Sequence, residues 1–247
     1  WISKSLESFS NDLDKFNIKL ETIISDEASF YSKLKTKDKI SLYWNKVYEP
    51  DHLKLDKEIE KILEKKNIPF KFFKGNILNE YQSITKNDGT PFKVFSPFWR
   101  NAEQVFLDAV PQKTSEIKKL KSKKTIFNSK DTFKQIMPKK DWFKKFDRYW
   151  KPSEDEAHKN LKEFVSDRIS KYGVDRDYPS INGSSKLSPF IRNGQIHVAA
   201  IYEKSSKDIK KNISIRKYIN ELGWREFSHS LINYFPQMLK GNLRKEF

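Results

Sequence analysis

The order of hydrophobic patterns between residues 39 and 73 limits the fold of this chain more than any other feature. Residues 39–44 alternate apolar with more polar side chains, which is typical of a strand. Apolar residues then recur at helical spacing over residues 55–63, and residues 70–73 form a second apolar run. A strand, a helix and a second strand in this order predict a right-handed crossover and a parallel sheet.

Helical patterns dominate the rest of the chain. After a turn at Asn87-Asp88-Gly89, we expect a helix over residues 98–109. Ser153 and Glu156 have the spacing of a capping box at a helix start. Two apolar stripes at helical spacing follow, one at Ala157, Leu161, Phe164, Val165 and Ile169, the other at Ile215, Tyr218, Ile219 and Leu222.

Residues 111–145 have a different composition, with twelve Lys and three acidic residues. An irregular segment of this length is uncommon inside a compact domain, so it indicates a connection between domains. Two interpretations remain open for this segment, a solvated linker and a basic strip that faces DNA.

The net charge of +16 favours anionic partners, either phosphates or an anionic membrane surface. Only 8 of the 49 basic residues are Arg, and lysine enrichment is also what an AT-rich genome produces, so charge alone does not decide for nucleic acid. No apolar run approaches the roughly 20 residues that span a membrane. Cysteine is absent, which excludes disulfides and thiolate metal sites, and the four His residues lack metal-ligand spacing.

Two short segments offer binding chemistry. Residues 176–194 contain two Gly, two Pro, four Ser and two Asn, and hydroxyls and backbone N–H groups of this kind can hold a phosphate. An ordinary serine-rich loop is the alternative. Glu221, Trp224 and Arg225 are spaced i, i+3 and i+4, which places a carboxylate, an indole and a guanidinium on one helix face.

Four stretches together resemble the DNA photolyase/cryptochrome family. They are "YWNKVYEP" (43–50), "DGTPFKVFSPFWR" (88–100), "RDYPSINGSSKLSPFIRNGQI" (176–196) and "NELGWREFSHSLINYFP" (220–236). The likeness is greatest to bacterial class I photolyases, which repair cyclobutane pyrimidine dimers. It implies an incomplete, Rossmann-like α/β domain over residues 1–105, an interdomain linker over 106–150 and the first part of an all-α flavin domain over 151–247. We therefore expect a piece of a longer protein, truncated at both ends.

The resemblance also implies roles for individual residues. The flavin-contacting positions of the family match Tyr172, Ser184, Ser185, Lys186, Leu187, Ser188 and Arg225, with Ser in place of Thr and Lys in place of Arg in the phosphate segment. The DNA- and lesion-contacting positions match Arg176, Glu221, Trp224 and Arg225. Core packing is the alternative for Trp224, and an ion pair with Glu221 is the alternative for Arg225. His229 either approaches the same site or is exposed to solvent.

By this resemblance, the expected activity is light-driven repair of pyrimidine dimers, in which excited reduced FAD lends an electron to the dimer. A cryptochrome-type photoreceptor and a basic, non-enzymatic nucleic-acid-binding protein are the alternatives. The expected partner is damaged DNA, bound by a monomer in the bacterial cytoplasm. No catalytic side chain is assignable in residues 1–247, and we expect weak flavin binding and little activity from this stretch alone.

An antenna chromophore is a further expectation, methenyltetrahydrofolate or deazaflavin. Lys240 matches a folate-contacting lysine of the family, whereas Asp51-His52 stands where folate-using members have Asn-Glu. The two observations point in opposite directions.

Overall fold

The computed structural model describes residues 1–34, 40–108, 116–121 and 135–243. The chain forms two compact units, and each unit combines two separate stretches of sequence. Unit 1 comprises residues 1–24 and 111–201, and unit 2 comprises residues 25–110 and 202–247. The predicted domains at 1–105, 106–150 and 151–247 are each one continuous stretch and do not coincide with these units. The predicted domain boundaries therefore remain a prediction. Within the predicted linker at 106–150, residues 109–115 and 122–134 lie outside the described residues.

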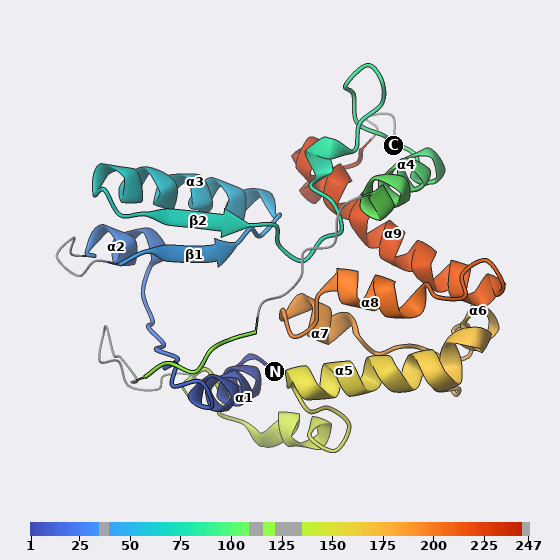
Figure 1. Cartoon of the computed structure of the whole chain (residues 1–247), viewed down its shortest axis with the longest axis horizontal. Helices are drawn as coiled ribbons and strands as arrows, with labels where there is room; N and C mark the ends of the chain where they lie inside the picture. The colour runs from blue at the N-terminus through green and yellow to red at the C-terminus, as the bar shows by residue number, and fades with distance from the viewer. Residues whose placement is uncertain (35–39, 109–115, 122–134, 244–247) are drawn as a thin grey trace. The chain divides into compact units, whose positions relative to one another are not determined.

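The predicted parallel strand pair is present in unit 2 and is confirmed. Strand β1 (Leu42–Asn45) pairs in parallel with β2 (Phe70–Phe73), with Leu42 opposite Phe70. Helix α3 (Pro50–Lys65) makes the crossover, with Pro50 in its first turn, and lies along the sheet (Figure 1). The chain is therefore mixed α/β with a small parallel sheet.

One face of this sheet supplies a hydrophobic core. Ile59 and Leu63 of α3 are buried together with Leu34 and Ile68, and partly buried side chains of both strands, among them Trp44, pack against them. Helix α2 (Glu27–Ser32) contacts α3 and is capped by Asp26, whose carboxylate accepts a hydrogen bond from Ser29 N at 2.8 Å.

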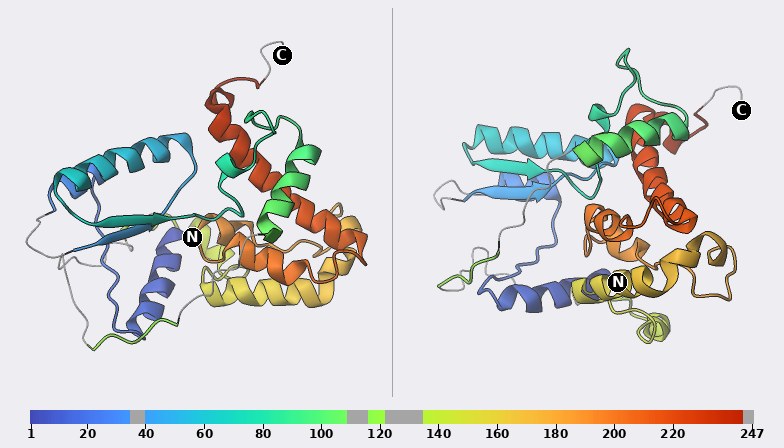
Figure 2. Two further views of the ribbon diagram at one scale, coloured as in Figure 1. Left: turned by 45° about the horizontal axis from the view of Figure 1, so that its top comes forward. Right: turned by 45° about the vertical axis from the view of Figure 1, so that its right-hand side comes forward.

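The second part of unit 2 is a pair of packed helices, α4 (Phe95–Asp108) and α9 (Ile213–Tyr234), which Figure 2 shows side by side in both views. Helix α4 begins three residues before the expected start at 98. Asn212 caps α9 by accepting hydrogen bonds from Ser214 N at 2.8 Å and Ile215 N at 3.4 Å. The predicted stripe on α9 is buried, which confirms the helix and its inner face; its members are Ile215, Tyr218, Ile219 and Leu222.

The contact between α4 and α9 depends on a glycine. A Cβ added at Gly223 would lie 2.5 to 2.8 Å from three ring atoms of Trp99, so only glycine allows the helices to approach this closely. Trp99 Nε1 also donates a hydrogen bond to Asn220 Oδ1 at 3.2 Å. These contacts fix the rotation of α9 against α4.

An ion pair joins the same helices further along. Arg216 Nη1 of α9 lies 2.8 Å from both carboxylate oxygens of Glu103 on α4. Tyr202, on helix α8 (Val198–Ser205), donates a hydrogen bond to Glu103 Oε1 at 2.8 Å. Both partners of the ion pair are only partly accessible, so its contribution exceeds that of a freely exposed pair.

Unit 1 is helical in its described residues. It contains α1 (Ile2–Asp14), α5 (Glu154–Glu163), α6 (Tyr172–Asp175) and α7 (Ser188–Arg192). Ser153 accepts a hydrogen bond from Glu156 N at 3.2 Å, so this half of the predicted capping box at the start of α5 is confirmed. Ser153 N donates to Lys151 O at 2.8 Å and not to the Glu156 side chain. A short helical turn at Asp141–Phe146 also belongs to unit 1, whereas the turns at Tyr81–Ser83 and Pro236–Leu239 belong to unit 2.

The stripe that begins on α5 runs through three kinds of helix. After α5 the backbone forms a π-helical turn at Phe164–Arg168 and a 3₁₀ turn at Ile169–Lys171. Four stripe residues are buried and Val165 is half-buried. None of the helices in the described ranges has the length and apolar character that crossing a membrane requires.

Candidate functional site

The first candidate group lies in unit 1, on the segment 176–188, which we call the serine loop. It follows α6, whose first residue Tyr172 is buried. The guanidinium of Arg176 lies over the Tyr172 ring, 5.2 Å from its centroid, and its Nε is 3.7 Å from an Asp177 carboxylate oxygen. The arginine at the start of the loop is therefore held by an aromatic ring and a neighbouring carboxylate.

Gly183 lets the serine loop fold back onto the end of α6. A Cβ at this position would lie 2.5 Å from Asp175 Cβ and 2.6 Å from the Asp175 carbonyl carbon. Contacts this short with backbone do not relax, so a larger residue would push the loop away from α6. The close approach places Ser184 and the residues after it beside the helix end.

Among residues 184–188 of the serine loop, one side chain is buried and the others are at least partly exposed. Leu187 is buried and anchors the segment, so its side chain offers no donor to a ligand. Ser184, Lys186 and Ser188 are exposed, and Ser185 is half-buried. Lys186 has φ of 55°, the left-handed conformation that L-residues other than Asn and Asp rarely adopt. The loop therefore keeps a strained backbone while its hydroxyls and ammonium group face solvent.

A hollow of about 330 Å³ opens within the serine loop. Arg176, Ser184 and Lys186 line it, together with Asp175, Tyr178, Pro179, Ser180, Ile181 and Asn182. The lining offers two cationic groups, two serine hydroxyls and one carboxylate, that of Asp175. The cationic groups and the hydroxyls suit a phosphate group. The structure thus brings three predicted ligand-binding residues to one cavity.

The second candidate group lies in unit 2, on the α9 face that carries Glu221, Trp224 and Arg225; we call it the indole face. Trp224 is 46% exposed. Its ring stacks on Phe95 of α4 with centroids 3.8 Å apart and planes 8° apart, and its edge meets Phe227 at 5.9 Å. The indole is therefore packed on one side and accessible elsewhere, which differs from burial in a core.

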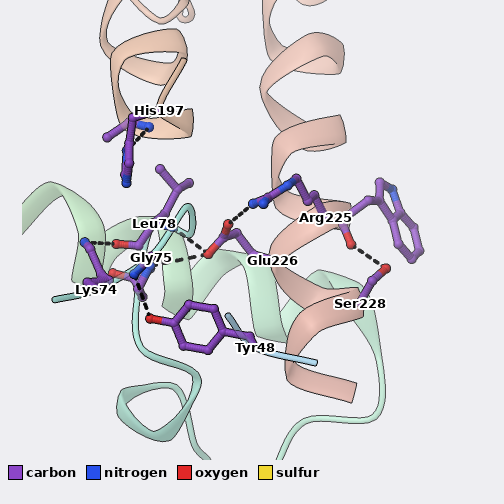
Figure 3. A network of polar contacts seen from close by, with 11 residues as sticks. Tyr48, Lys74, Gly75, Leu78, His197, Arg225, Glu226 and Ser228 are labelled. Atoms are coloured by element: carbon purple, nitrogen blue, oxygen red, sulfur yellow. Dashed lines mark hydrogen bonds and ion pairs between the residues drawn. The ribbon is translucent and has the colours of Figure 1, made fainter. Parts of the chain in front are cut away.

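Arg225 forms an ion pair with its neighbour Glu226, with Nη1 3.3 Å from Oε1. Glu226 is almost completely buried, and its other oxygen accepts hydrogen bonds from Leu78 N at 2.8 Å and Asn79 N at 3.3 Å. Figure 3 shows this carboxylate between Arg225 and Leu78. Glu226 thus joins α9 to the segment that follows β2.

Burial decides the charge state of this pair. Burial raises the pKa of Glu226 to about 7, although Arg225, the two backbone N–H groups and Lys74 act to lower it. Burial also lowers the pKa of Arg225 from its ordinary value, while Glu226 and Glu49 oppose that shift. Glu226 therefore takes up a proton more readily than an exposed glutamate does, while Arg225 is attracted by both Glu226 and Glu49.

The segment after β2 is held by further polar contacts (Figure 3). Lys74 Nζ donates a hydrogen bond to Leu78 O at 2.6 Å, and Gly75 N donates to Tyr48 Oη at 3.2 Å. Tyr48 Oη in turn donates to Glu80 Oε1 at 3.0 Å, and burial raises the pKa of Tyr48. The backbone that receives Glu226 is therefore fixed independently of α9.

The remaining predicted residues are placed as follows. His229 is half-buried, and its ring lies 6.3 Å from that of Tyr48. Lys240 is exposed after the turn at Pro236–Leu239, and Asp51 and His52 are exposed at the start of α3. Across the described ranges, no group of three His, Asp or Glu side chains has the arrangement of a metal site.

Two important residues, Phe95 and Glu226, are missing from the sequence predictions. Extending the α9 stripe by one turn beyond Leu222 reaches Glu226, and a carboxylate at a buried position indicates a polar partner. Phe95 carries no comparable signal, because its partner Trp224 is remote in the sequence.

Comparison with known proteins places these features in context. Residues 1–116 match the model of the DNA photolyase family. The chain is 27% identical over 254 residues to deoxyribodipyrimidine photo-lyase of Agrobacterium fabrum, a match that covers 100% of this chain and 52% of the relative. It is 30% identical over 194 residues to deoxyribodipyrimidine photo-lyase of Alkalihalophilus pseudofirmus, covering 73% of this chain and 37% of the relative.

A solved structure is similar over the same extent. The crystal structure of a bacterial class III photolyase from Agrobacterium tumefaciens matches with a TM-score of 0.87 at 25% identity, covering 100% of this chain and 52% of that one. The chain thus spans about half the length of these two Agrobacterium proteins.

Proposed function

Because this chain belongs to the DNA photolyase/cryptochrome family, we propose that the full-length protein is a deoxyribodipyrimidine photo-lyase. The reaction is light-driven repair of cyclobutane pyrimidine dimers in DNA. The proposal carries over the activity named for the relatives in Agrobacterium and Alkalihalophilus.

The observation that carries this proposal is the exposure of Trp224 on the indole face. Of two aromatic residues on neighbouring turns of α9, Phe227 is buried, whereas 46% of Trp224 is accessible. Enzymes that act on bases in duplex DNA extrude the base into a pocket and stack it on apolar rings. Trp224 supplies such a ring, and the Glu221 carboxylate on the same helix face can accept a hydrogen bond from a base N–H.

The donor set of the serine loop fits the diphosphate of a flavin dinucleotide. Ser184 and Lys186 line the hollow and offer a hydroxyl and a positive charge. Ser185 and Ser188 carry further hydroxyls in the same loop. Lys186 offers a point charge where the family motif has the bidentate fork of Arg, so we expect a less directional contact. Tyr172 and Arg225 complete the proposed flavin contacts.

When bound, reduced FAD supplies the electron that opens the cyclobutane ring after light absorption. The side chains of this chain hold and orient the reactants. Arg176 adds positive charge for the DNA backbone, and Trp224 presents an apolar surface to the extruded dimer. Glu226 positions Arg225 through their ion pair.

The finer assignments are parts of the same proposal. We assign residues 151–247 to an all-α flavin domain and the enzyme to class I, on the motifs alone, and we propose a monomer in the bacterial cytoplasm. An antenna chromophore, folate or deazaflavin, is proposed with Lys240 as a folate contact.

The test is a repair assay on the purified full-length protein. Incubation under blue light with an oligonucleotide that carries one thymine dimer should restore undamaged thymines, while a dark control should not. The purified protein should also show flavin absorbance. Flavin absorbance without repair would favour a cryptochrome-type photoreceptor, and absence of flavin would favour a non-enzymatic nucleic-acid-binding protein.

Trp224→Ala in the full-length protein provides the residue-level test. We expect binding of dimer-containing DNA to weaken about tenfold or more, because stacking on an aromatic side chain contributes about 1–3 kcal/mol per base. Binding of the undamaged sequence should change less. Equal weakening of both would mean that the indole only packs against its neighbours.

A further inference from the structure

Phe95 occupies one face of the Trp224 ring. The two centroids are 3.8 Å apart and the ring planes differ by 8°, so the rings lie flat against each other. Phe227 contacts both rings edge-on, at 5.9 Å from Trp224 and 6.0 Å from Phe95. Because one face is covered and one edge is in contact, the accessible part of Trp224 is the opposite face and the outer edge.

The position of Phe95 is itself fixed. It is the first residue of α4, and four residues later Trp99 packs against Gly223 and hydrogen-bonds Asn220 on α9. The ion pair between Glu103 and Arg216 fixes the next turns. The backbone of Phe95 therefore cannot shift away from Trp224 without disturbing several contacts between these helices.

A covered face limits how an indole can contact bases. A side chain that inserts as a wedge between base pairs needs both of its faces free, because a base lies on each side. Trp224 has room for a base on one side only. Restricting the ring to one orientation before binding also reduces the conformational entropy lost when a base stacks on it.

We propose that Phe95 is a positioning residue that makes Trp224 a one-sided wall for a single extruded pyrimidine pair, and not an intercalating wedge. This inference rests on the proposed function, because it assigns the ligand of the indole face. Phe95 acts through Trp224 and does not itself touch the ligand.

The experiment compares variants of the full-length protein for binding to an oligonucleotide with one thymine dimer and to the same sequence undamaged. Phe95→Leu keeps an apolar side chain but removes the flat ring, and Phe95→Tyr keeps the ring. Phe106→Leu is the matched control, because Phe106 is also half-buried on α4 and contacts an aromatic ring, that of Tyr202, at 4.9 Å. Melting temperatures of all variants are measured in parallel.

Phe95→Leu should lower the preference for the damaged strand about threefold to tenfold, the effect of losing one aromatic pair. Phe95→Tyr and Phe106→Leu should stay within about twofold of the unmodified protein. In a Trp224→Ala background, Phe95→Leu should cause no further loss of preference, because its effect passes through the indole.

Three results would overturn the inference. An unchanged preference in Phe95→Leu, beside a clear loss in Trp224→Ala, would refute positioning and leave the proposed function intact. An equal further loss in the Trp224→Ala background would assign Phe95 a general structural role. No preference for the dimer in the unmodified protein would refute the proposed function and this inference with it.

Discussion

The serine loop and the indole face solve the problem of ligand binding in opposite ways. In the serine loop, the side chains that suit a phosphate are mostly exposed around an open hollow, and Lys186 adopts a left-handed backbone. On the indole face, Trp224 stacks on Phe95, and Arg225 pairs with a buried carboxylate. The polar groups of the serine loop face solvent, where a ligand can contact them. On the indole face, Trp224 and Arg225 already contact other side chains of the protein.

This difference indicates in which region a substitution can change ligand affinity without changing the stability of the fold. Substitutions of the exposed side chains of the serine loop, Ser184, Lys186 and Ser188, should affect ligand affinity with little effect on folding, since few internal contacts are lost. Substitutions beneath the indole face should affect folding and binding together. Each of the following experiments tests that separation.

The largest effect is expected from the pH dependence of unit 2 through Glu226. The folded pKa of about 7 lies above the ordinary value of 4.5, so the folded state binds the proton more tightly than the unfolded state. The resulting stability is complete below about pH 4.5 and is lost as the pH rises through about 7, a decrease on the order of 3 kcal/mol. Urea unfolding between pH 4.5 and 8 measures this slope.

Glu226→Gln should flatten that slope, because an amide keeps the hydrogen bonds from Leu78 N and Asn79 N but does not titrate. The matched control is Glu203→Gln, which removes an exposed carboxylate from α8. A slope that is the same in both variants and in the unmodified protein would show that Glu226 is ionised throughout this range.

A smaller effect is expected from Gly223→Ala. The new methyl group would meet the Trp99 ring at 2.5 to 2.8 Å, and separating the helices should lower the free energy of unfolding by about 2 kcal/mol despite the better helix propensity of Ala. Chemical denaturation measures the change. Gly241→Ala is the control, because a Cβ there has no atom within 4 Å and should change stability by less than about 0.5 kcal/mol. A neutral Gly223→Ala would mean that α4 and α9 are free to separate.

The smallest effect on stability is expected from Lys186→Gly in the serine loop. Glycine adopts φ of 55° without strain, but it also gains entropy in the unfolded chain, so the net change should be within about 1 kcal/mol. Flavin retained by the purified full-length protein should nevertheless fall, because one charge leaves the hollow. Unchanged flavin content would remove Lys186 from the proposed phosphate contacts.

Local sequence patterns predict a helix or strand correctly where that element buries a single face against the hydrophobic core. The alternation around Leu42 and the stripe on α9 have a single period and a single buried side, and both predictions are confirmed. The stripe from Ala157 to Ile169 fails to reveal the change from α- to π- and 3₁₀-helix, because all three keep similar residues on the inner side.

The candidate site is predictable only in part. The spacing of Glu221, Trp224 and Arg225 gives their common helix face, whereas the composition of the serine loop alone is compatible both with a phosphate site and with an ordinary loop. The stack of Phe95 on Trp224 and the contact of Glu226 with Leu78 join residues more than a hundred positions apart. No local pattern encodes such pairs, because they arise from the packing of whole elements.

The contact between Trp99 and Gly223 also has a consequence for how this protein can diverge. Any residue with a Cβ at position 223 needs a smaller ring, or none, at position 99, and a smaller side chain at 99 alone would leave a void against the bare helix backbone. Substitutions at positions 99 and 223 are therefore coupled, and descendants of this sequence should change both residues or keep both.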